Sequence, residues 1–163
     1  MHIRAFHDDD WPALWAILAP VFAAGETYAV DRDIDARRAR RYWVDQPAAC
    51  LVAVDDRGQL AGSYFIKANQ AGPGDHVANC GYIVAEIARG QGIAGAMCEH
   101  SQQQARSLGF TAMQYNCVVA TNTSALALWQ RLGFAVVGTL PGAFRHPRLG
   151  PVDAHVLYKT LAG

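Results

Sequence analysis

The sequence lacks a net charge, because 14 basic residues balance 14 acidic ones. A neutral chain offers no electrostatic reason to expect a nucleic-acid or membrane partner, and we expect neither. The sequence also lacks any apolar run near the ~20 residues of a membrane-spanning helix, and its N-terminus lacks the basic-then-apolar order of a signal peptide. We therefore expect a cytoplasmic protein.

Cysteines are few, and their spacing is not that of a metal-binding or redox motif. The four of them, Cys50, Cys80, Cys98 and Cys117, fit no zinc or redox motif, and the six histidines form no i, i+4 pair. We expect no metal and buried, free thiols. A cysteine nucleophile is the alternative, although no histidine is placed in the sequence to activate one.

The composition is that of an ordinary globular protein, with 52% hydrophobic and 17% charged residues. A chain of 163 residues suits one domain, 1-163, which can bury most of its apolar surface without disulfides. No internal repeat or linker divides it.

Helical and strand patterns alternate along the chain. Strands are expected at His2–Phe6, Cys50–Val54, Leu60–Lys67, Val77–Val84, Ala112–Val118, Ala135–Gly138 and Asp153–Thr160. Helices are expected from Trp11 towards Ala24, from Asp33 or Asp35 to about Gln46, over Ile93–Leu108 and after Asn122. The segment Leu140–Val152 is expected to be a loop. This order predicts an α/β (α+β) fold, in which a mixed sheet has helices on both faces.

A glycine-rich turn joins the fourth expected strand to the third expected helix. Free backbone N–H groups and the positive end of the helix dipole make such a turn an anion site, most naturally for phosphate. Gly90-x-Gly92-x-x-Gly95 formally matches the dinucleotide-binding fingerprint, which also needs an acidic residue about 20 positions further on. No Asp or Glu occurs between Glu99 and Asp153, so the dinucleotide interpretation fails. A glycine turn that only starts a helix remains an alternative.

Two motifs resemble the signatures of the GNAT superfamily, the acyl-CoA-dependent N-acyltransferases. Arg89-x-x-Gly92-x-Ala94 resembles its pyrophosphate loop. Asn122–Phe134 resembles its second signature, an Asn with an Ala three residues on, an aromatic residue seven on and a closing Gly-Phe. The resemblance covers at least Val77–Gly138, and the strand order extends it over the whole chain. It implies a GNAT-like, mostly antiparallel sheet whose strands splay apart around the CoA site.

The resemblance implies acetyl-CoA as co-substrate, no metal, and a small-molecule amine or amino acid as acetyl acceptor. The residues that would bind acetyl-CoA are Val84, Arg89, Gly90, Gln91, Gly92, Ile93, Ala94, Gly95 and Asn122. By resemblance the loop holds the pyrophosphate, the Val84 backbone serves pantetheine and the acetyl oxygen, and Asn122 hydrogen-bonds the pantetheine arm.

One position departs from the family pattern. Many GNAT enzymes have a tyrosine that protonates the leaving thiolate where this chain has Trp129, and an indole N–H is no acid near neutral pH. A thiol with a pKa near ~8.5 can leave largely unprotonated, so turnover is not excluded. Asn116 is the expected substitute that stabilises the developing charge, and an ordinary strand-edge amide is the alternative.

A narrower resemblance is to the fungal N-acetyltransferases that detoxify proline analogues such as azetidine-2-carboxylate. It rests on Asn79, Tyr82, Asn116 and Asn122, with Trp129 in place of tyrosine, and the basic segment Phe144–Asp153 is also similar to relatives of that group. It implies Asn116 and Asn79 as catalytic residues, and an amino acid or proline-like analogue as acceptor, contacted by Asn79 and Tyr82. Glu26 and Tyr28 belong to the polar segment 25–29 that interrupts the helical pattern, which is either a loop that binds the acceptor or a plain surface turn. Another small amine, as in the phosphinothricin-type enzymes, is the alternative acceptor. A catalytically silent, CoA-binding regulatory domain also remains open, and so does a homodimer.

Overall fold

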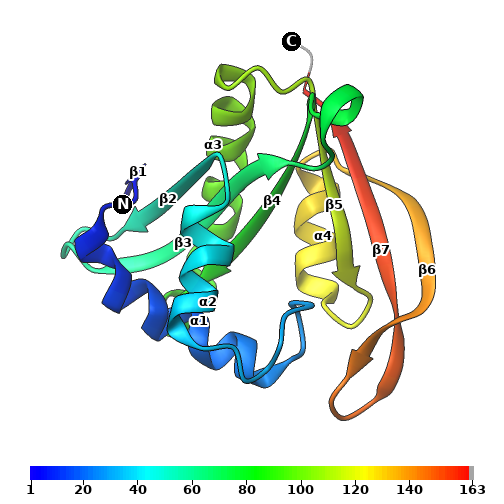
Figure 1. The fold of residues 1–163 in the computed structure, drawn as a ribbon, viewed down its shortest axis with the longest axis horizontal. Coiled ribbons are helices and arrows are strands. Elements are labelled where there is room, and N and C mark those ends of the chain that lie inside the picture. The colour runs from blue at the N-terminus through cyan, green and yellow to red at the C-terminus, as the bar shows by residue number, and fades with distance from the viewer. Residues whose placement is uncertain (162–163) are drawn as a thin grey trace.

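A mixed sheet of seven strands runs through the molecule in the order β1-β2-β3-β4-β5-β7-β6 (Figure 1). The computed structural model describes residues 1–161. The strands are β1 (His2–Ala5), β2 (Ala49–Val54), β3 (Leu60–Ala68), β4 (Val77–Val84), β5 (Ala112–Val119), β6 (Ala135–His146) and β7 (Gly150–Thr160). Neighbouring strands are antiparallel except β4 and β5, which are parallel.

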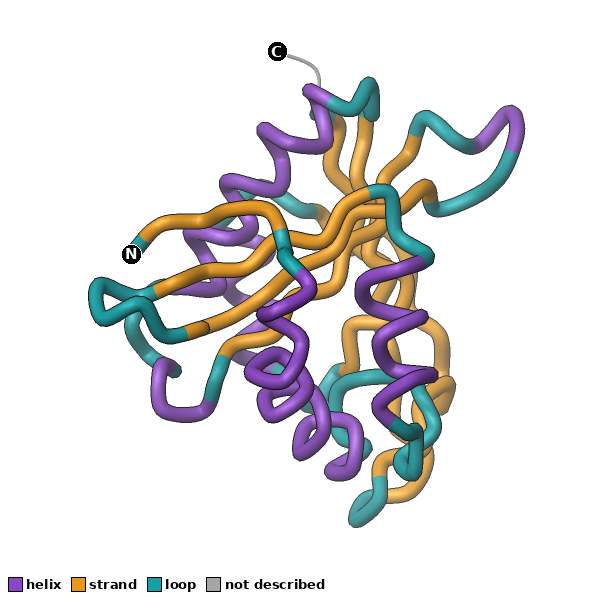
Figure 2. Tube along the Cα trace, turned by 60° about the vertical axis from the view of Figure 1, so that its left-hand side comes forward, coloured by secondary structure: helices purple, strands orange, loops and turns teal. Residues whose placement is uncertain are grey.

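Helices cover both faces of the sheet, which confirms the predicted fold class (Figure 2). They are α1 (Trp11–Ala24), α2 (Ala36–Arg40, continued by a π-helical turn at Arg41–Asp45), α3 (Ile93–Ser107) and α4 (Thr123–Arg131). Side chains of α3 and α4 pack on one face with Cys80, whereas those of α1 and α2 pack on the other with Ile83. This division follows from the alternation of side chains along β4. Among the helices of residues 1–161, none is both long enough and apolar enough to span a bilayer.

The two strands on either side of α3 in the sequence separate soon after they meet. β4 and β5 form only two ladder pairs, Val77 with Ala112 and Ala78 with Met113. β4 nevertheless continues to Val84, so its remaining length has no ladder partner on the β5 side. We call this region the β4–β5 opening, and it confirms the predicted splay.

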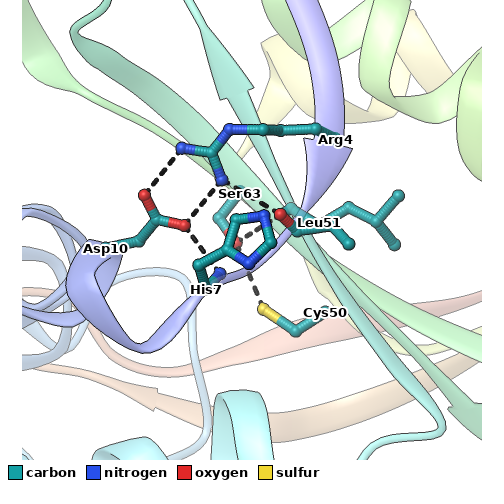
Figure 3. Close-up of polar contacts among 7 residues, drawn as sticks. Arg4, His7, Asp10, Cys50, Leu51 and Ser63 are labelled. Atoms are coloured by element: carbon teal, nitrogen blue, oxygen red, sulfur yellow. Dashed lines mark hydrogen bonds and ion pairs between the residues drawn. The ribbon is translucent and has the colours of Figure 1, made fainter.

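The start of α1 is tied to β1 by an ion pair. Arg4 donates hydrogen bonds to both carboxylate oxygens of Asp10, at 2.7 and 2.8 Å, and the backbone N–H of His7 donates to the same carboxylate (Figure 3). The hydrogen bond from Arg4 lowers the pKa of Asp10 below its ordinary value. In the same region the Ser63 hydroxyl donates to the Leu51 carbonyl and so links β3 to β2. These contacts fix the helix that leads into the α1–α2 connection.

The expected loop at Leu140–Val152 is wrong. β6 continues to His146 and β7 begins at Gly150, so most of this segment forms a long hairpin. Pro141 is accommodated because β6 is the edge strand of the sheet and its pairing with β7 is irregular between Leu140 and Phe144. The hairpin brings its basic residues to the side of the molecule that carries the α1–α2 connection.

Candidate functional site

The turn between β4 and α3 leaves the first N–H groups of α3 without a side-chain cap. Gly92 is the N-cap residue, and it and Gly90 have left-handed φ angles of 77° and 76°. Apart from each glycine and its two neighbours in the chain, no atom of residues 1–161 lies within 4 Å of the position that a Cβ would occupy at either glycine. Arg89 is exposed, and it makes no ion pair within residues 1–161. An uncapped, open helix start beside a free guanidinium can hold phosphate groups.

The other residues of the predicted loop extend this picture. Gln91 folds back, and its Nε2 lies 3.3 Å from the carbonyl oxygen of Ile87. Ile93 is buried under the helix start, and Gly95 faces α4, where a Cβ would lie 3.6 Å from Leu128. Their backbone N–H groups, rather than their side chains, are what they can offer to an anion.

Alternate residues of β4 turn their backbone groups towards the β4–β5 opening. The N–H of Ala85 donates to the carbonyl of Ala61 at 2.8 Å, and hydrogen-bonded pairs alternate along an antiparallel ladder. The N–H and C=O groups of Tyr82 and Val84 therefore point away from β3, towards the unpaired side. This is the orientation that the resemblance requires of the Val84 backbone.

Tyr28 reaches this edge of β4 from the α1–α2 connection. Its hydroxyl donates to the carbonyl of Tyr82 at 2.6 Å, and its ring packs edge-on against Phe22 and Trp43. Burial raises the pKa of Tyr28 well above its ordinary value, so the phenol is a neutral donor and not a base. Tyr28 therefore positions the strand edge in this structure.

The side chain of Tyr82 lies on the opposite face of the sheet, within an aromatic cluster. Its hydroxyl oxygen is 2.6 Å from that of Ser101 and 2.9 Å from that of Tyr115. The ring of Trp129 lies 5.0 Å from that of Tyr82 and 5.4 Å from that of Tyr115, between centroids. Burial raises the pKa of both tyrosines well above the ordinary value, so neither phenol is a ready acid.

The two asparagines predicted to be catalytic lie near the closed end of the opening. Asn79 donates from Nδ2 to the carbonyl of Gln114 at 2.9 Å and so bridges β4 to β5 just past their last ladder pair. Asn116 is exposed, donates to Oδ1 of Asn69 at 2.7 Å and accepts from Nε2 of Gln114 at 2.9 Å. It lies where the pairing of β5 with β7 is irregular. The two side chains thus share one neighbour, Gln114.

A pocket of about 290 Å³ lies beside the α1–α2 connection, lined by Glu26, Thr27, Thr121, Asn122, His146, Arg148 and Leu149. Arg148 forms an ion pair with Glu26 at 2.8 Å. Asn122 also caps α4, because its Oδ1 accepts from the N–H of Ala125 at 3.4 Å. The other predicted site residues on β4 and β5 do not line this pocket. We call it the Glu26 pocket.

The sequence assigns no individual role to His146 or Arg148, two residues of the Glu26 pocket. Both belong to the β6–β7 hairpin, far along the chain from Glu26. The signal in the sequence was the basic segment Phe144–Asp153 as a whole, which is similar to relatives of the proline-analogue enzymes and could also suit another small amine or amino acid. The fold was needed to bring that segment to the α1–α2 connection.

A larger pocket, of about 520 Å³, opens between α3, α4 and β7 and contains none of the predicted site residues. One of its lining cations, Lys159, donates to Oε1 of Gln102 at 2.6 Å and to the carbonyl of Leu132 at 2.7 Å. These bonds close the end of α4 onto α3 and β7. We therefore assign this pocket to the architecture and not to the chemistry.

Residues 1–161 contain neither a cluster of metal ligands nor an activated thiol. Within residues 1–161 no three His, Cys, Asp or Glu side chains are grouped so as to hold a metal ion. All four cysteines are free, Cys80 and Cys98 are buried and Cys50 and Cys117 are half-buried. Burial raises the pKa of every one of these thiols, to about 11 for Cys50, which disfavours the nucleophilic thiolate.

The mixed sheet, the divergence of β4 from β5 and the uncapped helix start after β4 are together typical of the GNAT acetyltransferases. A model of the acetyltransferase (GNAT) family matches residues 11–134. The chain belongs to this family.

Individual relatives agree with the family match. The chain is 32% identical over 111 residues to the N-acetyltransferase aca1 of Schizosaccharomyces pombe, a match that covers 68% of this chain and 53% of that protein. The chain thus spans about half the length of that relative.

Solved structures repeat the fold. A GCN5-related N-acetyltransferase from Kribbella flavida has a TM-score of 0.92 and 42% sequence identity, with 98% of this chain and 96% of that chain covered. A GNAT superfamily phosphinothricin acetyltransferase from Sinorhizobium meliloti, solved in complex with AcCoA, has a TM-score of 0.87. It is 19% identical, with 99% of this chain and 88% of that chain covered, and this likeness concerns the fold alone.

Proposed function

We propose that this chain transfers the acetyl group of acetyl-CoA directly to the amine of a small molecule, and that the acceptor is an amino acid or a proline-like analogue. The observation that carries the proposal is the uncapped start of α3, which lies directly after the unpaired edge of β4. A phosphate-binding helix start and a row of free backbone groups leading away from it suit a long, pyrophosphate-bearing thioester.

The residues of the loop fit the pyrophosphate. Gly90 and Gly92 leave open space where a Cβ would stand, and the start of α3 has no side-chain cap. Arg89 adds a positive charge at an exposed position. We assign the pyrophosphate to Arg89–Gly95, as the resemblance implies, and one face of the pantetheine arm to Asn122 through its Nδ2, since its Oδ1 already caps α4.

Acetyl-CoA supplies a thioester carbonyl that an amine can attack. In our proposal the N–H of Val84 donates to the acetyl oxygen, where negative charge develops during attack. The carbonyl of Tyr82, held by Tyr28, lies on the same free edge and can accept a hydrogen bond from the attacking amine. Asn116 and Asn79 remain our candidates for the other side of the opening.

The leaving thiolate has more need of a hydrogen-bond donor, which stabilises its negative charge, than of an acid that protonates it. Trp129 is packed between Tyr82 and Tyr115, and its indole N–H has no hydrogen-bond partner within residues 1–161. No buried side-chain nitrogen or oxygen of those residues lacks a partner, so this N–H reaches solvent. We assign it, with Asn116, to hydrogen-bonding of the departing sulfur. A thiolate is a good leaving group, since an ordinary cysteine thiol has a pKa of ~8.5, and it can leave before it is protonated.

The acceptor pocket that we favour is the Glu26 pocket. Its volume, about 290 Å³, is just below the range of small-molecule sites, which begins at about 300 Å³, and it suits a small acceptor. It presents one carboxylate and one guanidinium, which complement the two charges of an amino acid. The Glu26–Tyr28 segment connects it to the β4 edge, because Glu26 lines the pocket and Tyr28 contacts Tyr82.

A catalytically silent CoA-binding domain is the competing function, favoured by the tryptophan in place of the family's tyrosine. The release of free thiol from acetyl-CoA, measured with a panel of amino acids and simple amines, separates the two. We expect release with at least one acceptor class, and a melting temperature that rises with acetyl-CoA by mass action but not with NADH. Stabilisation by acetyl-CoA without thiol release would support the silent domain. Equal stabilisation by NADH would reject the assignment of the loop.

A further inference from the structure

The Glu26 pocket is built from three segments that are distant in the sequence. Glu26 and Thr27 come from the α1–α2 connection, Thr121 and Asn122 from the start of α4, and the remaining wall from the β6–β7 hairpin. The hairpin contributes a buried histidine and an arginine. Their hydrogen bonds define what the pocket can recognise.

His146 is held in one tautomer by the backbone of its own hairpin. It is only 5% exposed, and its Nδ1 lies 3.2 Å from the N–H of Arg148 and 3.3 Å from the N–H of Leu149. A ring nitrogen that accepts N–H groups carries no proton, so in the neutral ring the proton is on Nε2. His146 is therefore a donor at Nε2.

The Nε2–H of His146 is left for a ligand. No residue within 1–161 accepts from it, and no buried side-chain nitrogen or oxygen in that range lacks a partner, so this atom reaches solvent. His146 is one of the residues that line the Glu26 pocket, and we take its exposed Nε2 to face that pocket. A nearly buried donor without a protein partner, on a side chain that lines a pocket, can be matched by an acceptor atom from outside the protein.

Arg148 supplies the charge that such an acceptor atom would need. Within residues 1–161 the guanidinium of Arg148 has one contact, from Nη1 to Glu26 at 2.8 Å, although a guanidinium has five N–H donors and can bind a carboxylate through two of them. The side chain of Arg148 is 74% exposed and that of Glu26 is 37% exposed, so the pair is weak and can exchange partners.

From these contacts we infer that His146 and Arg148 bind the carboxylate of the acetyl acceptor, which makes the substrate an amino acid and not a simple amine. This inference rests on the proposed function. The incoming carboxylate accepts from Nε2 of His146 and from the guanidinium of Arg148, and it replaces Glu26 as the partner of Arg148. Glu26, released from that pair, then faces the ammonium end of the amino acid.

The test compares matched acceptors that differ by a carboxylate. We would measure thiol release for azetidine-2-carboxylate against azetidine, L-proline against pyrrolidine, and glycine against methylamine. Two variants are informative. His146→Asn retains an acceptor near the position of Nδ1 for the hairpin N–H groups but loses the pocket donor, and Arg148→Met retains the side-chain length but loses the charge.

We expect each variant to raise KM for the carboxylated acceptor by about ten- to hundredfold, the usual worth of a hydrogen bond to a charged group. KM for the matched amine and for acetyl-CoA should stay within about twofold, and so should kcat. His146→Gln is the complementary control, because it retains a donor towards the pocket and loses the hairpin acceptor. It should lower the melting temperature more than His146→Asn and raise KM less.

Several results would overturn the inference. Wild-type protein that acetylates the amine as well as its carboxylated partner would reject carboxylate recognition and leave the proposed function intact. Variants that lower the melting temperature and slow both acceptors equally would make His146 and Arg148 structural. If the wild type releases no thiol with any pair, the proposed function fails. Binding of the amino acids in the presence of CoA would then be measured by calorimetry. Binding to the wild type that is lost in Arg148→Met would still support the carboxylate site. No binding to the wild type would reject that site.

Discussion

The hydroxyl of Tyr28 lies 2.6 Å from the main-chain carbonyl oxygen of Tyr82, and this bond joins the α1–α2 connection to the unpaired edge of β4. A strand carbonyl without a ladder partner is free to tilt. The phenol fixes its direction at the place where, in our proposal, the amine meets the thioester.

Tyr28→Phe should therefore lower kcat several-fold and cost about 1 kcal/mol of folding free energy, the usual net worth of one hydrogen bond. KM for acetyl-CoA should not change. Tyr42→Phe is the matched control, because Tyr42 belongs to the same aromatic cluster and its hydroxyl bonds no residue within 1–161. If the two variants have equal kcat, the Tyr28 bond serves stability alone.

Gly92→Ala should weaken the binding of CoA at least tenfold by calorimetry, because a methyl group would stand where the phosphate approaches the uncapped helix start. It also introduces backbone strain of about 1 kcal/mol, since φ is 77°. Gly58→Ala has comparable strain, at a φ of 79° and with equally open surroundings, in the β2–β3 turn. Similar losses of CoA affinity in both variants would mean that strain alone accounts for the effect.

Trp129→Tyr should fold and change turnover by less than about tenfold, which is ~1.4 kcal/mol of barrier. The indole fills the space between Tyr82 and Tyr115, and a phenol fills most of it. Steady-state kinetics with acetyl-CoA decide the matter. A gain of a hundredfold or more would show that the tryptophan cripples the site, which would favour the silent domain.

Asn116→Ala should lower kcat by about a hundredfold and leave the melting temperature near that of the wild type, if Asn116 assists the thioester. Its amide is exposed, so its bonds to Asn69 and Gln114 contribute little to folding. An unchanged kcat would remove Asn116 from the mechanism.

Asn79→Ala should behave differently from Asn116→Ala. The bond from Asn79 to the Gln114 carbonyl lies where β4 and β5 part, and we expect its loss to destabilise the fold by about 1 kcal/mol in urea unfolding. A higher KM for the amine should accompany that loss if Asn79 also contacts the acceptor. Destabilisation with an ordinary KM would make Asn79 purely structural.

The half of the site that local sequence encodes was predictable. Glycines that allow left-handed φ angles at Gly90 and Gly92, followed by a helix without a capping side chain, can be read from a few adjacent residues. The splay of β4 from β5 came with the family resemblance and was confirmed. The roles of the individual side chains in acetyl transfer stay predictions.

The half of the site that tertiary structure assembles was not predictable. Prolines in Leu140–Val152 indicated a loop, but an edge strand tolerates a residue without an N–H group, and the segment forms a hairpin. The meeting of Arg148 with Glu26 depends on that hairpin, and the tautomer of His146 depends on its backbone. Tyr82 shows the same limit. Its side-chain hydroxyl belongs to a buried cluster, whereas its carbonyl faces Tyr28.

β4 and β5 diverge from their last ladder pair, Ala78 with Met113. The hydroxyl oxygens of Tyr82 and Tyr115 lie 2.9 Å apart and link the two strands beyond that pair, and Tyr82 is four residues, roughly 13 Å, along β4 from it. The ring of Trp129 packs against both tyrosines. Any wider separation of the two strands at this level must lengthen or break that hydrogen bond. The bond between the two phenols therefore opposes widening of the β4–β5 opening.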